Sequence, residues 1–292
     1  MVLIDGKVVS EKLKAELKIE VSRLIDSGTD PHLAAILVGD DPASQTYVRN
    51  KEKACKETGI ISSIYRQSGS ITEKELLAMI DFINNDPEVH GLIVQLPLPK
   101  HINPEKVVEH IRPEKDVDGF HPVNIGRMVQ GMPSYLSATP FGIMKMLEHY
   151  KIETEGKHCV VLGRSNIVGT PVSILLSRKA KPGNCTVTMC HSKTENIEKF
   201  TRDADILIAA IGQQHFVTAD MVKEGAVVID VGIHRVPSAE TQSGYKLIGD
   251  VKFDEVSRKA SYITPVPGGV GLMTIVALLT NTVKAAKKEI YP

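Results

Sequence analysis

The sequence lacks a net charge, since 35 Lys and Arg residues balance 35 Asp and Glu residues over 292 positions. It has no run of like charges, so it offers no basic surface for nucleic acid. No apolar stretch is long enough to span a membrane. The N-terminal residues reach Asp5 and Lys7 too early for a signal peptide. These absences predict a cytoplasmic protein with neither a nucleic-acid nor a membrane partner.

Cysteine is also scarce. The four cysteines are Cys55, Cys159, Cys185 and Cys190, and none of them forms a C-x-x-C pair. Cys159 and Cys185 stand at the start of strand-like runs. The spacing therefore favours reduced thiols over disulfides and predicts no metal site.

What the sequence does contain is an alternation of short apolar runs with amphipathic segments. A chain of this length usually divides its core, so we expect two α/β domains or one domain with an insertion. The predicted strands are 33–38, 60–65, 91–96, 158–162, 186–190, 205–211, 227–231 and 261–264. The predicted helices are 7–27, 42–58, 73–84, 141–150, 168–179 and 271–290. Such alternation indicates parallel sheets wrapped by helices. The proline-rich stretch 112–140 lacks periodicity and is interpreted as a long functional loop before a domain boundary near residue 140.

The most informative segment is 160–169. A β-branched run ends at Gly163, a polar loop with Arg164 and Ser165 follows, and Gly169 opens a helix. Free N–H groups at such a helix start attract phosphate oxygens. The spacing is not G-x-G-x-x-G, however, so an ordinary turn between strand and helix stays open as an alternative.

The end of the next predicted strand favours a dinucleotide and indicates which one. In NAD sites this strand end carries a carboxylate for the ribose 2′-hydroxyl. Here it carries His191-Ser192-Lys193. Ser192, together with Arg164, would accept a 2′-phosphate, so the sequence predicts NADP rather than NAD. Two later strands, 205–211 and 227–231, are each followed by a glycine, which permits close backbone approach to a ligand or simply turns the chain.

The first half of the chain has its own candidate residues. Asp41 and Pro42 are a helix N-cap and first helical residue. Tyr47 and Lys51 follow on one face of that helix, where a merely solvated face is the alternative. Gln95 is a polar residue near the end of a buried strand and requires hydrogen-bond partners.

Two further segments complete the pattern. Residues 115–119 place carboxylates, including Asp118, in the long loop. Residues 264–271 carry Pro267, Gly268 and Gly271 in a stretch that suits close approach to a flat ligand, with a flexible connector as the alternative.

Together these segments resemble the bifunctional methylenetetrahydrofolate dehydrogenase/methenyltetrahydrofolate cyclohydrolase family. The matching motifs are Tyr47-Val48-Arg49-Asn50-Lys51, Gln95-Leu96-Pro97-Leu98-Pro99, Lys115-Asp116-Val117-Asp118-Gly119, Gly163-Arg164-Ser165 with Val168-Gly169, and Pro267-Gly268-Gly269-Val270-Gly271. They occur in the family order and span essentially the whole chain.

The resemblance implies an α/β protein of two domains, usually a homodimer, with folate in a cleft between them. Residues 1–140 with 271–292 would form the folate-binding catalytic domain, and 141–270 the Rossmann-type NADP domain with a parallel sheet. The implied reactions are NADP-dependent oxidation of 5,10-methylenetetrahydrofolate and hydrolysis of the 5,10-methenyl product to 10-formyltetrahydrofolate. They belong to one-carbon metabolism, in tetrahydrofolate interconversion and purine biosynthesis.

The resemblance also assigns roles. Lys51 would be the main catalytic group of the hydrolysis, Tyr47 would stack on the aminobenzoyl ring, Gln95 would hold Lys51, and Asp118 would anchor the pterin. Pro267, Gly268 and Gly271 would contact the folate. The implied NADP contacts are Gly163, Arg164, Ser165, Ser192 and Ile233.

Two positions depart from the family pattern. Leu272 replaces a proline after the last glycine, which bears on loop geometry and folate affinity, and Ala138 replaces a cysteine. Two other interpretations stay open: a dehydrogenase without cyclohydrolase activity, and a non-catalytic dinucleotide-binding regulator. Retention of Lys51 and Asp118 argues against both.

Overall fold

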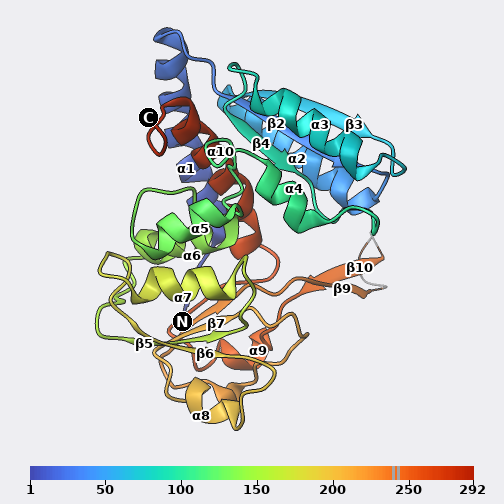
Figure 1. Ribbon diagram of the computed structural model, residues 1–292. Coiled ribbons are helices and arrows are strands. Elements are labelled where there is room, and N and C mark those ends of the chain that lie inside the picture. The colour runs from blue at the N-terminus through green and yellow to red at the C-terminus, as the bar shows by residue number, and fades with distance from the viewer. Residues whose placement is uncertain (239–240, 242–243) are drawn as a thin grey trace. The chain divides into compact units, whose positions relative to one another are not determined.

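The computed structural model describes residues 1–238, 241 and 244–292 (Figure 1). The chain folds into two compact units, each built from two separate segments. Met1–Glu11 and Thr139–Thr274 form one, called here the large-sheet unit, and Lys12–Ala138 and Ile275–Pro292 form the other, the small-sheet unit.

The large-sheet unit is built on six strands in the order β1-β11-β8-β7-β5-β6, and every pairing in this sheet is parallel. The strands are β1 Val2–Leu3, β5 His158–Leu162, β6 Thr186–Cys190, β7 Ile206–Ala209, β8 Val227–Asp230 and β11 Tyr262–Ile263. The central strands β7 and β8 are buried along their whole length. Continuous apolar runs of this kind are what a parallel sheet covered on both faces requires.

The other elements of this unit are mostly short. They are α6 Ala138–His149, α7 Gly169–Ser177, α8 Ile197–Thr201, α9 Phe253–Val256 and the 3₁₀ turns η1 Ala219–Met221 and η2 Val270–Leu272. Figure 1 shows α7 beside the sheet, where it contacts β5 and β6. β9 His234–Pro237 and β10 Tyr245–Ile248 pair as an antiparallel ribbon that leaves the sheet after β8 and returns before α9.

The small-sheet unit contains three parallel strands in the order β3-β2-β4. The strands are β2 His32–Val38, β3 Ile61–Gln67 and β4 Gly91–Val94; the helices are α2 Pro42–Thr58, α3 Glu73–Asn84, α4 Pro104–His110 and α5 Pro122–Val129. Figure 1 shows α2 and α3 running along the strands. α3 begins with a capping box in which Thr72 and Glu75 satisfy each other's backbone N–H groups. Asp41 caps α2 by accepting a hydrogen bond from Ser44 N, as the sequence predicts.

Two helices cross from one unit to the other along the chain. α1 Gly6–Asp26 passes the division at Lys12, and α10 Met273–Ala286 passes it at Ile275. The expected two-domain α/β class with a parallel sheet is confirmed, and most predicted strands and helices are present with ends shifted by a few residues. The four cysteines are free and buried, in agreement with the prediction of reduced thiols.

The interpretation of 112–140 as one long loop is wrong, because the stretch contains α5 and the start of α6. Pro122 occupies the first helical position of α5, where its missing N–H has no cost, and His121 caps the helix. The ribbon of β9 and β10 was also not expected. Its residues alternate between half-buried and exposed in short runs that carry little apolar signal.

Candidate functional site

The first cluster of predicted residues lies in the small-sheet unit, on α2 and just after β4. Lys51 Nζ donates a hydrogen bond to Gln95 Oε1 at 3.1 Å. The amide nitrogen of Gln95 donates to the carbonyl of Leu96 at 2.6 Å, which turns its oxygen toward the lysine. Tyr47 lies one helical turn before Lys51 and is 52% exposed. The helix therefore presents an accessible ring beside an ammonium group that is held in place.

Asp118 approaches the same lysine from the loop that follows α4. This loop is attached to β4, because Leu92 N donates to the carbonyl of Lys115 at 2.8 Å and Leu92 forms a parallel bridge with Asp116. Burial raises the pKa of the Asp118 carboxyl above its ordinary value, and the positive charge of Lys51 offsets only part of this shift. Tyr47, Lys51, Gln95 and Asp118 thus belong to one unit, in which Lys51 is hydrogen-bonded to Gln95 and influences Asp118 through its charge.

Two residues near Asp118 support the loop, and the sequence does not show that their role differs from that of Asp118. Asp116 is buried and accepts hydrogen bonds from the backbone N–H groups of Phe120 and His121 and from Asn124 Nδ2. Its burial raises the pKa of this carboxyl to about 7. Lys115 Nζ donates to the carbonyls of Ile83 and Asp86 at the end of α3. Because both side chains are engaged in hydrogen bonds within the unit, they support the loop.

The nucleotide loop lies in the large-sheet unit, at the carboxyl end of β5. Gly163 has a φ of +115°, and a Cβ on it would lie 2.2 Å from the carbonyl oxygen of Ala210, just after β7. A Cβ on Gly169 would lie 2.2 Å from the carbonyl oxygen of Gly163. Both positions therefore need glycine, and the loop folds closely over the ends of two strands.

The polar residues of this loop reach solvent. Arg164 and Ser165 are exposed, and Ser165 Oγ accepts from Val168 N at 3.2 Å at the start of α7. Ser192 is exposed at the end of the adjacent strand, where Cys190 pairs in register with Leu162. A guanidinium and a hydroxyl thus follow neighbouring strand ends, with no carboxylate among residues 191–193. This set of groups suits an anionic phosphate.

The remaining predicted residues of this unit are Ile233, Pro267, Gly268 and Gly271. Ile233 is 51% exposed after β8, and a Cβ on Gly271 would lie 3.1 Å from Ile233 Cδ1. The loop with Pro267 and Gly268 packs on the start of α1, where Gly6 N donates to the carbonyl of Gly268 at 2.9 Å. Pro267, Gly268 and Gly271 thus share a unit with the nucleotide loop.

Sequence reasoning missed one polar cluster at this edge of the sheet. Asp230 and Asp250 are 4% and 0% exposed, and His234 Nε2 lies 2.7 Å from Asp250 Oδ1. The sequence signal is weak, since the two aspartates are twenty residues apart; Asp230 stands two residues before Gly232, and Asp250 directly follows Gly249.

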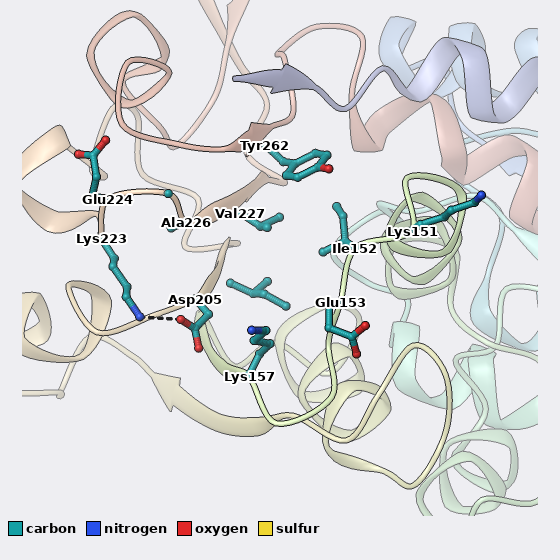
Figure 2. A pocket seen from close by; sticks show the side chains of 12 residues that line it. Lys151, Ile152, Glu153, Lys157, Asp205, Lys223, Glu224, Ala226, Val227 and Tyr262 are labelled. Atoms are coloured by element: carbon teal, nitrogen blue, oxygen red, sulfur yellow. Dashed lines mark hydrogen bonds and ion pairs between the residues drawn. The ribbon is translucent and has the colours of Figure 1, made fainter.

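A cavity of about 370 Å³ opens at the opposite, amino-terminal edge of the large sheet (Figure 2). Figure 2 shows Ile152, Val227 and Tyr262 around it, with the ion pair between Lys223 and Asp205 at one side. The Lys223 Nζ to Asp205 Oδ1 distance is 2.6 Å. None of the predicted site residues lines this cavity, so the predicted chemistry lies elsewhere.

Within residues 1–238, 241 and 244–292, no group of three or more His, Cys, Asp and Glu side chains is arranged to hold a metal ion. Over the same part of the chain, no helix combines the length and apolar character that a membrane span needs.

Known proteins resemble this chain over its whole length. The model of the tetrahydrofolate dehydrogenase/cyclohydrolase catalytic domain matches residues 4–118, and that of the NAD(P)-binding domain of the same enzymes matches residues 137–290. The bifunctional protein FolD of Bacteroides fragilis is 60% identical, with both chains covered completely.

Solved structures agree. The bifunctional FolD of Campylobacter jejuni is 51% identical with a TM-score of 0.93, and 99% of each chain is covered. A Trypanosoma brucei FolD, solved with NADP and an inhibitor, is 38% identical with a TM-score of 0.92 and covers 100% of this chain and 99% of its own. The sequence motifs, the two matching domains and these relatives agree: the chain belongs to the tetrahydrofolate dehydrogenase/cyclohydrolase family.

Proposed function

We propose that the protein oxidises 5,10-methylenetetrahydrofolate with NADP⁺ and hydrolyses the 5,10-methenyl product to 10-formyltetrahydrofolate. The observation that carries the second step is the hydrogen bond of 3.1 Å from Lys51 Nζ to Gln95 Oε1 beside Asp118. The family assignment and the retained motif residues support both steps.

The dinucleotide residues fit their ligand. When bound, NADP⁺ supplies the hydride acceptor of the first step. Arg164 and Ser192 would bind the 2′-phosphate, and Ser165 and Gly163 would bring backbone and hydroxyl groups to the rest of the dinucleotide. Ile233, half exposed beside Gly271, would contact it through apolar surface. The oxidation needs no protein acid or base, so these residues serve mainly to align the reacting rings.

The hydrolysis depends on the chain's own side chains. Water adds to the methenyl carbon, one of the two carbon–nitrogen bonds of that carbon breaks, and a proton must reach the departing nitrogen. Lys51 is the group that would move this proton, because its Nζ is partly buried and held by Gln95. Asp118 would bind the pterin through hydrogen bonds, and Tyr47 would stack on the aminobenzoyl ring. Pro267, Gly268 and Gly271 are proposed as further folate contacts.

One assay tests the function. Purified protein is mixed with methylenetetrahydrofolate and NADP⁺ while reduced cofactor and the absorbance of the methenyl compound are followed together. We expect cofactor reduction without accumulation of methenyltetrahydrofolate. Accumulation would identify a dehydrogenase without the hydrolysis step. Absence of reduction would favour a non-catalytic dinucleotide-binding regulator.

Several properties complete the proposal. The folate-binding part would be residues 1–140 with 271–292, and the NADP part residues 141–270. The compact units divide the chain slightly differently, because β1 pairs with β11 and brings the first residues into the large-sheet unit. A homodimer and a cytoplasmic location are further predictions, which light scattering and cell fractionation would test.

A further inference from the structure

One buried carboxylate holds two loops at the carboxyl edge of the large sheet. Asp250 Oδ2 accepts hydrogen bonds from the backbone N–H groups of Ile211 and Gly212, each at 2.9 Å, just after β7. Asp250 Oδ1 lies 2.7 Å from His234 Nε2, at the start of β9. Both oxygens are thus used, and their partners come from segments after two different strands.

A second aspartate supports the first. Asp230, at the end of β8, accepts from the N–H groups of Gly232, Asp250 and Val251 at 2.9, 3.0 and 2.9 Å. It therefore fixes the backbone of Asp250 itself. The packing leaves no room around the pair: a Cβ on Gly249 would lie 1.8 Å from Asp230 Oδ2, and a Cβ on Gly232 would lie 2.3 Å from Asp250 Oδ1.

The two loops held by Asp250 border the proposed dinucleotide residues. Ala210, against which Gly163 packs, directly precedes Ile211. Ile233 directly precedes His234. The position of the nucleotide loop and the position of Ile233 are therefore both tied to one carboxylate that is 0% exposed and that cannot reach a ligand in solvent.

A carboxylate without solvent contact is costly unless all its hydrogen-bond partners are in place. Two of the partners of Asp250 are backbone N–H groups of Ile211 and Gly212, which belong to the loop after β7 and not to the strand itself. Hydrogen bonds to a charged acceptor are the strong ones, and they hold the donor in one orientation. The loops are consequently prearranged, and binding does not have to order them.

We propose that Asp250, fixed by Asp230, is a positioning residue for the NADP site that aligns the loop after β7 with the loop that carries Ile233. This proposal rests on the proposed function, because it takes Gly163 and Ile233 as cofactor contacts. It assigns Asp250 no contact with either substrate and no part in the hydrolysis.

The test compares Asp250→Ala with wild type by fluorescence titration of NADPH, which measures binding without catalysis. We expect the dissociation constant to rise at least tenfold. The KM for NADP⁺ should rise in parallel, while kcat at saturating NADP⁺ falls less. Hydrolysis of supplied methenyltetrahydrofolate should stay within twofold of wild type, because Lys51, Gln95 and Asp118 lie in the other unit.

A matched control is Asp205→Ala in the same sheet. Asp205 also accepts a backbone N–H, from His158 at 3.0 Å, and pairs with Lys223, but it lies at the amino-terminal edge (Figure 2). Its variant should lower thermal stability and leave NADPH affinity within twofold. Asp250→Asn should recover most of the affinity, because its oxygen still accepts from Ile211 and Gly212 and its amide nitrogen takes the place of the oxygen beside His234.

If Asp250→Ala does not fold, His234→Ala gives the answer, since His234 is partly exposed and supplies one partner of the three. His234→Ala should weaken NADPH binding at least threefold. Unchanged NADPH affinity in folded Asp250→Ala, or in folded His234→Ala where Asp250→Ala does not fold, would overturn the proposal, as would equal losses of binding and hydrolysis. Failure of wild type itself to bind NADPH would instead count against the proposed function.

Discussion

Lys51 and Gln95 form an oriented pair in which the lysine donates to the amide oxygen at 3.1 Å. The amide nitrogen is occupied by the carbonyl of Leu96, so the glutamine cannot present that nitrogen to the lysine without losing a hydrogen bond. Nζ therefore has a neutral acceptor, and among residues 1–238, 241 and 244–292 no carboxylate forms a salt bridge with it. A lysine held this way is kept in position without being fixed as an ion pair, which suits a group that must transfer a proton.

Lys51→Met should abolish hydrolysis of methenyltetrahydrofolate and leave NADPH binding unchanged. The substitution keeps a flexible chain of similar length but removes the amine. Lys53→Met is the matched control on the same helix, since Lys53 is exposed and pairs with the surface residue Glu57. The measurements are the decay of methenyl absorbance and NADPH fluorescence. Full hydrolysis by the Lys51 variant would refute its assignment.

Gln95→Glu should slow the hydrolysis at neutral pH by about tenfold or more. A carboxylate at this position would form an ion pair with Lys51 and favour its protonated form; one pKa unit corresponds to about 1.4 kcal/mol, or tenfold. The rate should recover toward higher pH, which a pH–rate profile of the purified variant would reveal. A profile that matches wild type would mean that Gln95 does not control the lysine.

Ser192→Asp should reverse the cofactor preference. A carboxylate at this strand end repels the 2′-phosphate and can bind a ribose 2′-hydroxyl. Loss of a hydrogen bond to a charged group costs about 1.5–3 kcal/mol, so the KM for NADP⁺ should rise roughly tenfold or more. The KM for NAD⁺ should fall. Thr194→Asp, two residues on, is the comparison; if both variants behave alike, Ser192 does not contact the phosphate.

Local patterns were sufficient to predict much of this fold. Asp41 and Pro42 predict the start of α2, and the continuous apolar runs predict β5 and β7. α5 was missed because Pro122 and Gly126 look like loop residues, although proline is favourable at a first helical position. Such errors arise at residues such as proline, which occur both in loops and at the first position of a helix, because only the residues packed around them decide which structure forms.

The site was predictable only in part. Local patterns single out Lys51 on a helix face and Gln95 at a strand end, and the family motifs assign their roles, whereas their direct hydrogen bond joins residues 44 positions apart. Asp250 could not be found, because two of its partners are backbone amides 39 and 38 residues away, and any residue type supplies a backbone amide. Sequence reveals which side chains carry chemistry more readily than which ones hold the backbone around them.

Gly163→Ala should lower both stability and NADPH affinity. The added Cβ would lie 2.2 Å from the carbonyl oxygen of Ala210, and the backbone has a φ of +115°, which residues other than glycine rarely adopt. We expect a loss of about 2 kcal/mol or more in unfolding free energy, in the range of strained backbone positions. Gly126→Ala is the contrast, because that glycine lies in α5 with open space around it and should gain about 0.5–1 kcal/mol. Chemical denaturation of both variants measures the difference, and equal effects would contradict the assigned strain.

Asp116 should make stability fall as pH rises. Burial raises the pKa of its carboxyl from 3.8 to about 7 in the folded protein, so between these values the folded state binds more protons than the unfolded state. Stability from this group is therefore fully present below about pH 4 and is lost as pH passes about 7, on the order of 4 kcal/mol in total.

Asp116→Asn cannot ionise, so its unfolding free energy should decline less than that of wild type between pH 5 and 8. The amide keeps the oxygen that accepts from His121 and Asn124, and any cost of the substitution is the same at each pH. Glu16→Gln, an exposed change of the same charge, should follow wild type. Denaturant unfolding at a series of pH values gives the comparison, and parallel curves for wild type and Asp116→Asn would show that the buried carboxyl is ionised throughout.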